Sequence, residues 1–258
     1  MQKEKQTKKN LKEKISLVGI MPAYNEEENI RQTTIEWYKA LSECDKNAKL
    51  LVLNDGSKDN TLEILKEIHK EYPNIVICNK KNSGHGRTLY YGYKKALELN
   101  PKWVFQTDSD GQTNPNEFKE FWSNRFDYDV ILGHRKGRQD GGSRIVVTNV
   151  LKILLFLFFR IWIKDANVPF RLMKKDILKK ALYYISKEDT LPNIYLSVIF
   201  CNPKNYIKTK FIDITFKPRQ GGVNSINLKR IFKIGYDSLF NFMKFKKKIK
   251  NSNLFYED

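Results

Sequence analysis

The fold is decided by residues 103–115, Trp-Val-Phe-Gln-Thr-Asp-Ser-Asp-Gly-Gln-Thr-Asn-Pro. Its first four residues are a short β-favouring run, which predicts a buried strand. Asp108 and Asp110 stand two residues apart where that strand ends, so both carboxylates can turn to one side. Two close carboxylates repel each other, and a hard divalent cation such as Mg²⁺ or Mn²⁺ relieves the repulsion while it clamps a diphosphate. Gln112 offers the same ion a neutral oxygen, although this stretch alone is also compatible with a solvated Asp-Gly turn.

Buried strands, polar loops and amphipathic helices alternate through the first half of the chain. Strands are expected at 15–22, 49–53, 74–78, 103–106 and 129–133. Helices are expected from an Asn25 N-cap to about residue 42, from Thr61 onward, and from the glycine loop 82–87 to residue 97. This alternation predicts the α/β class with a doubly wound, mostly parallel sheet. Ligands of such sheets bind beyond the carboxyl ends of the strands, where every polar loop of this half falls.

The second half has a different character. Residues 146–163 predict a helix with almost no polar face, which is either a core helix or an amphipathic helix in a membrane interface. Helices at 174–184 and 191–200, strands near 170 and 206–217, and a basic aromatic helix at 228–249 follow. We expect a basic tail at 1–14, one domain at 15–228 and a basic amphipathic segment at 229–258.

The charge of the chain favours anionic partners, and its cysteines favour a reducing compartment. The 258 residues include 47 Lys and Arg against 29 Asp and Glu, a formal charge of +18. Such a surface attracts nucleic acid, anionic lipid or phosphorylated substrates, although a lysine-rich composition alone would give the same count. Cys44, Cys78 and Cys201 match neither zinc nor disulfide spacing, which favours the cytoplasm. The polar N-terminus does not resemble a signal peptide, and the apolar run 151–163 is shorter than the roughly 20 residues of a membrane span.

Four motifs together resemble the GT-A glycosyltransferases of family 2, and most closely their dolichyl- and polyprenyl-phosphate sugar transferases. They are Pro22-Ala-Tyr-Asn-Glu26, Asn54-Asp-Gly-Ser-x-Asp-x-Thr61, Gly84-His-Gly86 and Asp108-Ser-Asp-x-Gln112. Each motif alone is weak, but their order and spacing extend the resemblance over about residues 15–228. The resemblance implies an inverting transfer of a sugar from a nucleotide-sugar to a polyprenyl phosphate.

The resemblance also implies roles for individual residues. Asp108, Asp110 and Gln112 would hold the divalent metal, and Asp108, Asp110 and Arg135 would act in catalysis. Asp55 matches the family acid that holds the nucleobase, while Asn54 replaces a second acid that the family usually has. The donor-binding residues would be Pro22, Tyr24, Glu26, Asp55, Gly84 and Ser109.

Basic residues carry the expectation of a lipid phosphate acceptor. Arg144, Thr148 and Arg219 stand where the subfamily places groups around the acceptor phosphate. A phosphate is already ionised, so it needs cations that bind and align it rather than a strong base. We therefore expect an anionic membrane surface as a partner and a peripheral position on the inner face of the membrane.

Two other functions stay open at this point. One is a family 2 glycosyltransferase that acts on a glycan acceptor for surface polysaccharide. The other is a non-catalytic basic protein that binds membranes or nucleic acid. Intact Asp55, Asp108 and Asp110 argue against a degenerate site, and the sequence shows no nucleic-acid-binding motif, so we expect no nucleic-acid partner. The sugar, the nucleotide and the oligomeric state are left open.

Overall fold

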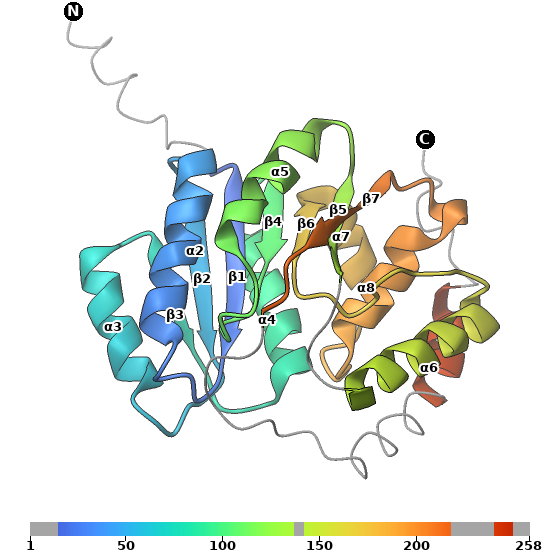
Figure 1. Cartoon of the computed structure of the whole chain (residues 1–258), viewed down its shortest axis with the longest axis horizontal. Helices are drawn as coiled ribbons and strands as arrows, with labels where there is room; N and C mark the ends of the chain where they lie inside the picture. The colour runs from blue at the N-terminus through green and yellow to red at the C-terminus, as the bar shows by residue number, and fades with distance from the viewer. Residues whose placement is uncertain (1–14, 137–141, 218–239, 250–258) are drawn as a thin grey trace, which may run out of the picture.

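The computed structural model describes residues 15–136, 142–217 and 240–249, with the backbone alone for 142–147. A seven-stranded sheet with the order β3-β2-β1-β4-β6-β5-β7 forms its centre (Figure 1). The strands are β1 (Leu17–Ala23), β2 (Lys49–Asn54), β3 (Ile75–Asn79), β4 (Trp103–Gln106), β5 (Val130–Arg135), β6 (Arg171–Lys174) and β7 (Thr209–Ile214). Strand β6 is antiparallel to both β4 and β5, whereas the other neighbouring pairs are parallel.

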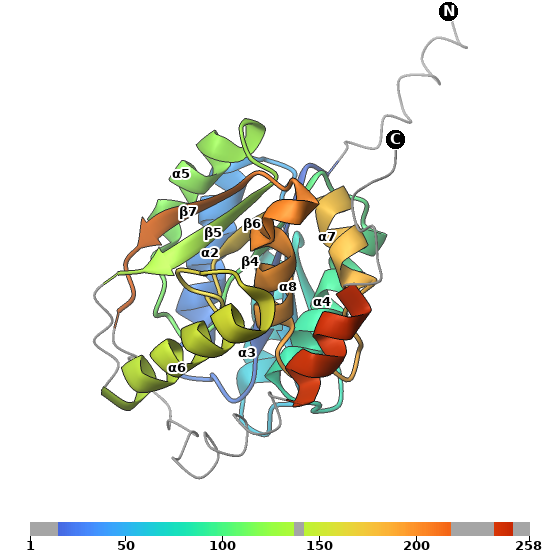
Figure 2. The same cartoon turned by 90° about the vertical axis from the view of Figure 1, so that its right-hand side faces the viewer.

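Helices cover both faces of this sheet. They are α2 (Ile30–Cys44), α3 (Thr61–Glu71), α4 (His85–Glu98), α5 (Phe118–Ser123), α6 (Gly142–Phe159), α7 (Lys175–Leu182) and α8 (Pro192–Cys201), with short 3₁₀ turns η2 (Pro115–Glu117), η3 (Asn124–Phe126) and η4 (Pro203–Asn205). Helix α2 contacts α3 and α5 on one face, and α4 contacts α7 and α8 on the other (Figures 1 and 2). Every residue of β1 is buried, as expected for a central parallel strand.

An aromatic cluster joins the helices to the middle of the sheet. The ring of Trp37 lies 5.1 Å from that of Phe105 and 5.4 Å from that of Phe170. Phe105 and Phe170 are themselves 5.0 Å apart, in an edge-on arrangement. This cluster fixes the strand β4 whose end carries the two acids, because all three side chains are fully buried.

Helix α6 and the C-terminal helix 240–249 pack together outside the sheet (Figure 2). Phe242 is fully buried, with its ring 6.0 Å from Phe158 and 5.9 Å from Phe159 of α6. Phe245 lies 4.4 Å from Tyr195 of α8. Within the described residues, no helix combines the length and the hydropathy that crossing a bilayer requires.

The structure confirms the predicted fold class and corrects some boundaries. The sheet and the strand–helix alternation are as predicted. Asn25, however, does not cap α2: it has a left-handed backbone with φ 53°, and the helix begins at Ile30. Helix α6 ends at Phe159 rather than at residue 163, because Arg160 turns left-handed at φ 59°. The expected tail 1–14 and most of the expected helix 228–249 lie outside the described residues.

Candidate active site

The loops after β1, β2, β3 and β4 meet at the carboxyl edge of the sheet, because these strands are parallel neighbours. Backbone-to-side-chain hydrogen bonds join the first two loops. The Lys58 amide donates to Asn25 Oδ1 at 2.8 Å, and the Asn25 amide donates to Ser57 Oγ at 3.0 Å. The Glu26 amide donates to Thr61 Oγ1 at 2.9 Å. Asn25 therefore holds two loops together instead of capping a helix.

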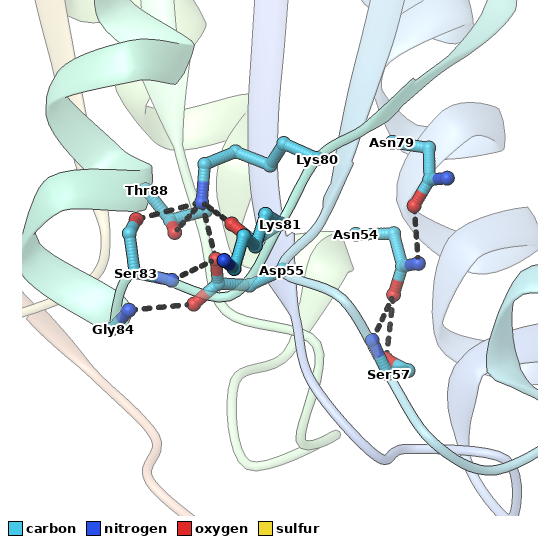
Figure 3. A network of polar contacts seen from close by, with 9 residues as sticks. All are labelled: Asn54, Asp55, Ser57, Asn79, Lys80, Lys81, Ser83, Gly84 and Thr88. Carbon is cyan, nitrogen blue, oxygen red and sulfur yellow. Dashed lines mark hydrogen bonds and ion pairs between the residues drawn. The ribbon is translucent and has the colours of Figure 1, made fainter.

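Asp55 is buried at the end of β2 and binds the glycine loop (Figure 3). Its Oδ1 accepts from the Ser83 amide at 2.9 Å, and its Oδ2 accepts from the Gly84 amide at 2.9 Å. Oδ1 also forms a short ion pair with Lys80. The Lys80 ammonium donates to Ser83 Oγ at 2.7 Å and to Thr88 Oγ1 at 3.1 Å, so it joins Asp55 to the start of α4.

This environment keeps Asp55 ionised. Burial alone would raise the pKa of its carboxyl, but hydrogen bonds from Lys80, the Ser83 amide and Thr88 outweigh burial and lower the pKa below its usual value. The carboxylate therefore has a structural role in the protein without a nucleotide. Its predicted contact with a nucleobase stays a prediction.

Asn54, which stands where the family usually has another acid, is neutral and fully engaged. Its Nδ2 donates to Asn79 Oδ1 at 2.8 Å, from β2 to β3 (Figure 3). Its Oδ1 accepts from Ser57 Oγ at 2.5 Å. A second carboxylate at this position would lie in the same buried polar layer as Asp55, so the amide avoids a repulsion between like charges.

The glycine loop needs its glycines for different reasons. Gly84 has φ 90°, a conformation that side chains other than hydrogen rarely allow. A Cβ on Gly86 would lie 2.1 Å from the carbonyl oxygen of Thr190, so the loop before α8 approaches α4 directly at this point. Glu188 of the same loop pairs with Arg87 at 3.4 Å. Residues 186–191 therefore border the predicted donor site.

The three predicted metal ligands, Asp108, Asp110 and Gln112, lie beyond β4. Asp108 and Asp110 are half-buried, and Ser109 between them is buried. Asp110 Oδ1 accepts from the Gln112 amide at 3.1 Å, which closes a tight turn around Gly111. Gln112 is buried, and its Nε2 donates to the carbonyl of Lys217 at 2.9 Å. The side-chain oxygen is then the atom that Gln112 could offer to an ion.

The donor set fits a divalent cation that also binds the substrate. Mg²⁺ and Mn²⁺ take oxygen ligands, and Mg²⁺ is commonly held by one or two carboxylates together with substrate phosphates. Asp108, Asp110 and Gln112 provide this kind of set. Across the described parts of the chain, no group of three or more His, Cys, Asp and Glu side chains is placed to hold a metal ion.

Arg135 is placed differently from an open phosphate-binding cation. At the end of β5 its Nε donates to Asp165 Oδ2 at 2.7 Å and its terminal nitrogen donates to Asp165 Oδ1 at 2.8 Å. Both side chains are nearly buried, and the guanidinium lies 5.0 Å from the Phe216 ring. Its predicted role at a phosphate stays a prediction. Asp165 was not predicted from the sequence.

A buried polar cluster under the site was also missed. Arg171 is fully buried at the start of β6, where it pairs in register with Gln106. Its guanidinium donates to the carbonyls of Val168 at 2.7 Å and Asn193 at 3.1 Å. Burial lowers the pKa of Arg171. Tyr93 donates to Gln106 Oε1, so the residue two before Asp108 is also fixed.

The remaining predicted residues fall into three groups. Pro22 and Glu26 are buried beside the first loop, whereas Tyr24 is exposed at its tip. Thr148 is half-buried on α6. The side chain of Arg144 and the whole of Arg219 lie outside the described residues.

The family model described as Glycosyl transferase family 2 matches residues 20–182. The chain therefore belongs to glycosyltransferase family 2, and it is a glycosyltransferase. This membership confirms the resemblance that the motifs carry, and it favours an enzyme over the alternative of a non-catalytic binding protein.

The chain is also similar to three named proteins. The chain is 24% identical over 231 residues to an undecaprenyl-phosphate 4-deoxy-4-formamido-L-arabinose transferase of Proteus mirabilis, covering 88% of this chain and 68% of that one. It is 35% identical over 106 residues to the dolichyl-phosphate beta-glucosyltransferase ALG5A of Trichomonas vaginalis, covering 39% of this chain and 32% of that protein. Glucosyl-3-phosphoglycerate synthase of Mycobacterium tuberculosis, solved with Mn²⁺, uridine diphosphate and phosphoglyceric acid, shares the fold with a TM-score of 0.63 at 14% identity; the match covers 90% of this chain and 78% of that structure.

Proposed function

We propose that this glycosyltransferase moves a sugar from a nucleotide-sugar to a polyprenyl phosphate, at the inner face of the cytoplasmic membrane. The observation that carries the proposal is the match over 88% of the chain to an enzyme named for an undecaprenyl-phosphate acceptor. The Asp108 and Asp110 carboxylates at the carboxyl end of β4 support it, since they suit a metal-bound diphosphate.

The chemistry requires one displacement. A phosphate oxygen of the acceptor forms a bond to the anomeric carbon, while the bond from that carbon to the nucleoside diphosphate breaks. The departing diphosphate takes the electron pair, and a divalent ion held by Asp108 and Asp110 would stabilise its charge. One displacement inverts the configuration. Because a lipid phosphate is already ionised, this route needs no general base.

A glycan acceptor is the second candidate, and Asp189 is the observation that favours it. Asp189 lies in the loop 186–191 beside Gly86 and Arg87. Burial raises the pKa of its carboxyl. A carboxylate with a raised pKa can take the proton from a sugar hydroxyl, which a lipid phosphate does not require.

The two acceptors are separated by one experiment on Asp189→Asn. We expect the wild-type protein, given Mn²⁺ and a panel of nucleotide-sugars, to glycosylate a soluble short-chain polyprenyl phosphate and to invert the anomeric configuration. Asp189→Asn should keep that activity within about threefold, as should the control Glu188→Gln, because no proton is removed. Transfer to a plain glycan alone, abolished by Asp189→Asn, would establish the second candidate instead.

A further inference from the structure

Helix α6 presents an apolar face to the outside of the molecule. Val150, Ile153, Phe156 and Leu157 are 50%, 53%, 42% and 55% exposed. At 100° per residue, positions 150, 153 and 157 lie along one side of the helix, with 156 next to them. We call these four residues, together with the exposed Trp162 that follows the helix, the α6 face.

This face takes no part in holding the helix in place. Leu155 on the opposite side is fully buried, and Leu151, Leu154, Phe158 and Phe159 pack against the core. The rings of Phe158 and Phe159 contact Phe242 of the C-terminal helix. The helix is therefore anchored by its inner side, and polar residues on the outer side would leave that packing unchanged.

Exposed cations border the α6 face, close to its two aromatic rings. Arg160 is exposed, with its guanidinium 5.8 Å from the Phe156 ring. The Trp162 ring lies 6.2 Å from the same ring. Lys164 is exposed just beyond. Apolar side chains flanked by Trp, Lys and Arg are typical of helices that lie in the headgroup region of a bilayer.

We propose that the α6 face is the surface by which the protein docks on an anionic lipid bilayer. The proposal rests on the proposed function, since α6 also carries Thr148, a predicted neighbour of the lipid phosphate. Charge complementarity favours this occupant, because Arg160 and Lys164 are exposed beside the face and the whole chain carries a formal charge of +18. A second copy of the chain fits less well. A second copy would bring the same exposed cations, Arg160 and Lys164, beside the same face, so it offers them no opposite charge.

The test compares vesicle binding of the full chain with that of Ile153→Glu/Leu157→Glu. Both side chains are about half exposed, so the fold should persist. The matched control is Phe126→Glu/Tyr183→Glu, at two apolar side chains that are 76% and 79% exposed elsewhere. Point substitutions are preferable to deleting residues 229–258, because that deletion would also remove the buried Phe242 and Phe245.

We expect the wild type and the control to bind vesicles of phosphatidylcholine and phosphatidylglycerol in equal parts, and to be released by salt. The α6 variant should bind at least about tenfold more weakly, because two apolar side chains that the bilayer would bury are replaced by charged ones. Its transfer to a soluble short-chain acceptor should be unchanged.

Equal vesicle binding by the α6 variant and the wild type overturns the proposal. So does a wild-type dimer that the α6 variant dissolves, since the face would then join two copies. Vesicle binding requires no sugar transfer, so failure of the proposed function would appear separately, as an inactive wild type.

Discussion

The loops beyond β1–β3 and the surface of α6 are built in opposite ways. The loops are tied by directed polar contacts, such as Asp55 to the Ser83 and Gly84 amides and Asn25 to the Lys58 amide. The α6 face instead presents apolar side chains with no directed contact, such as Val150 and Ile153. A nucleotide requires fixed hydrogen-bonding positions, whereas a lipid surface requires only area and charge. The two constructions suit the soluble donor and the membrane acceptor of the proposed function.

Strand β6 lies between β4 and β5 in the sheet. It is antiparallel to β4, which carries the acids, and to β5, which carries Arg135. Its first residue, Arg171, binds the carbonyls of the loop that supplies Asp165. The comparison therefore yields three substitutions: one at the predicted metal ligands, one in β6 and one in the donor loops.

The largest effect is expected from Asp110→Asn. The change would remove a predicted charged oxygen ligand of the ion that the proposed mechanism places beside the departing diphosphate. Transfer should then fall by at least about a thousandfold, about 4 kcal/mol in the barrier. The transfer assay with a Mn²⁺ titration measures the effect. Asp176→Asn, an exposed acid on α7, is the control and should be fully active. Wild-type activity that persists in excess chelator would exclude the metal role.

Much of this site followed from the sequence because its signals are local. A buried strand followed by polar residues, repeated with helices between, places all such loops at one edge of a parallel sheet. The strand β4 and the turn containing Asp108 and Asp110 were predicted in this way. The family motifs then supplied roles for residues such as Asp55, which the structure places in the predicted loop.

The missed residues depend on contacts that are distant in sequence. Arg171 contacts Asn193, and Arg135 contacts Asp165 thirty residues away. One signal was present: an arginine that opens a strand of apolar residues buried on both faces has to find partners inside the protein. The end of α6 was missed because Ile161 and Ile163 continue the apolar pattern although they lie in a loop. Apolar runs do not distinguish buried loops from helices.

A smaller effect is expected in β6, from Arg171→Met. The substitution keeps an unbranched apolar stem but removes the guanidinium, so the carbonyls of Val168 and Asn193 lose this donor. The free energy of unfolding should fall by about 3 kcal/mol, measured by urea denaturation. Arg125→Met is the matched control: the Arg125 guanidinium stacks 4.1 Å from the Trp122 ring near the surface, and its loss should cost less than about 1 kcal/mol.

The same variant tests whether Arg171, through the loop 165–168, positions Arg135. If the loop 165–168 positions Arg135, the folded Arg171→Met protein should bind uridine diphosphate with Mn²⁺ normally but show a lower kcat. Arg171→Lys should recover part of that loss, because an ammonium can still donate to one carbonyl. A normal kcat in folded Arg171→Met would show that the action of Arg135 does not depend on the contacts of Arg171 with this loop.

The smallest effect is expected in the donor loops, from Asp55→Asn. The amide keeps the shape of the side chain and one accepting oxygen but loses the charge that faces Lys80. Because Lys80 retains Ser83 Oγ and Thr88 Oγ1, the cost should be about 1–2 kcal/mol of unfolding free energy at neutral pH.

The sign of the pH dependence follows from the lowered pKa of Asp55. A carboxyl whose pKa is lower in the folded state stabilises the protein above its unfolded pKa, and this stability is lost as the pH falls through the folded pKa. The difference between wild type and variant should therefore be constant near neutrality and shrink below about pH 4. Calorimetry with uridine diphosphate and Mn²⁺ completes the comparison. Weaker binding to the variant at full folding supports the donor role of these loops, and equal binding would mean that Asp55 serves only to hold the glycine loop.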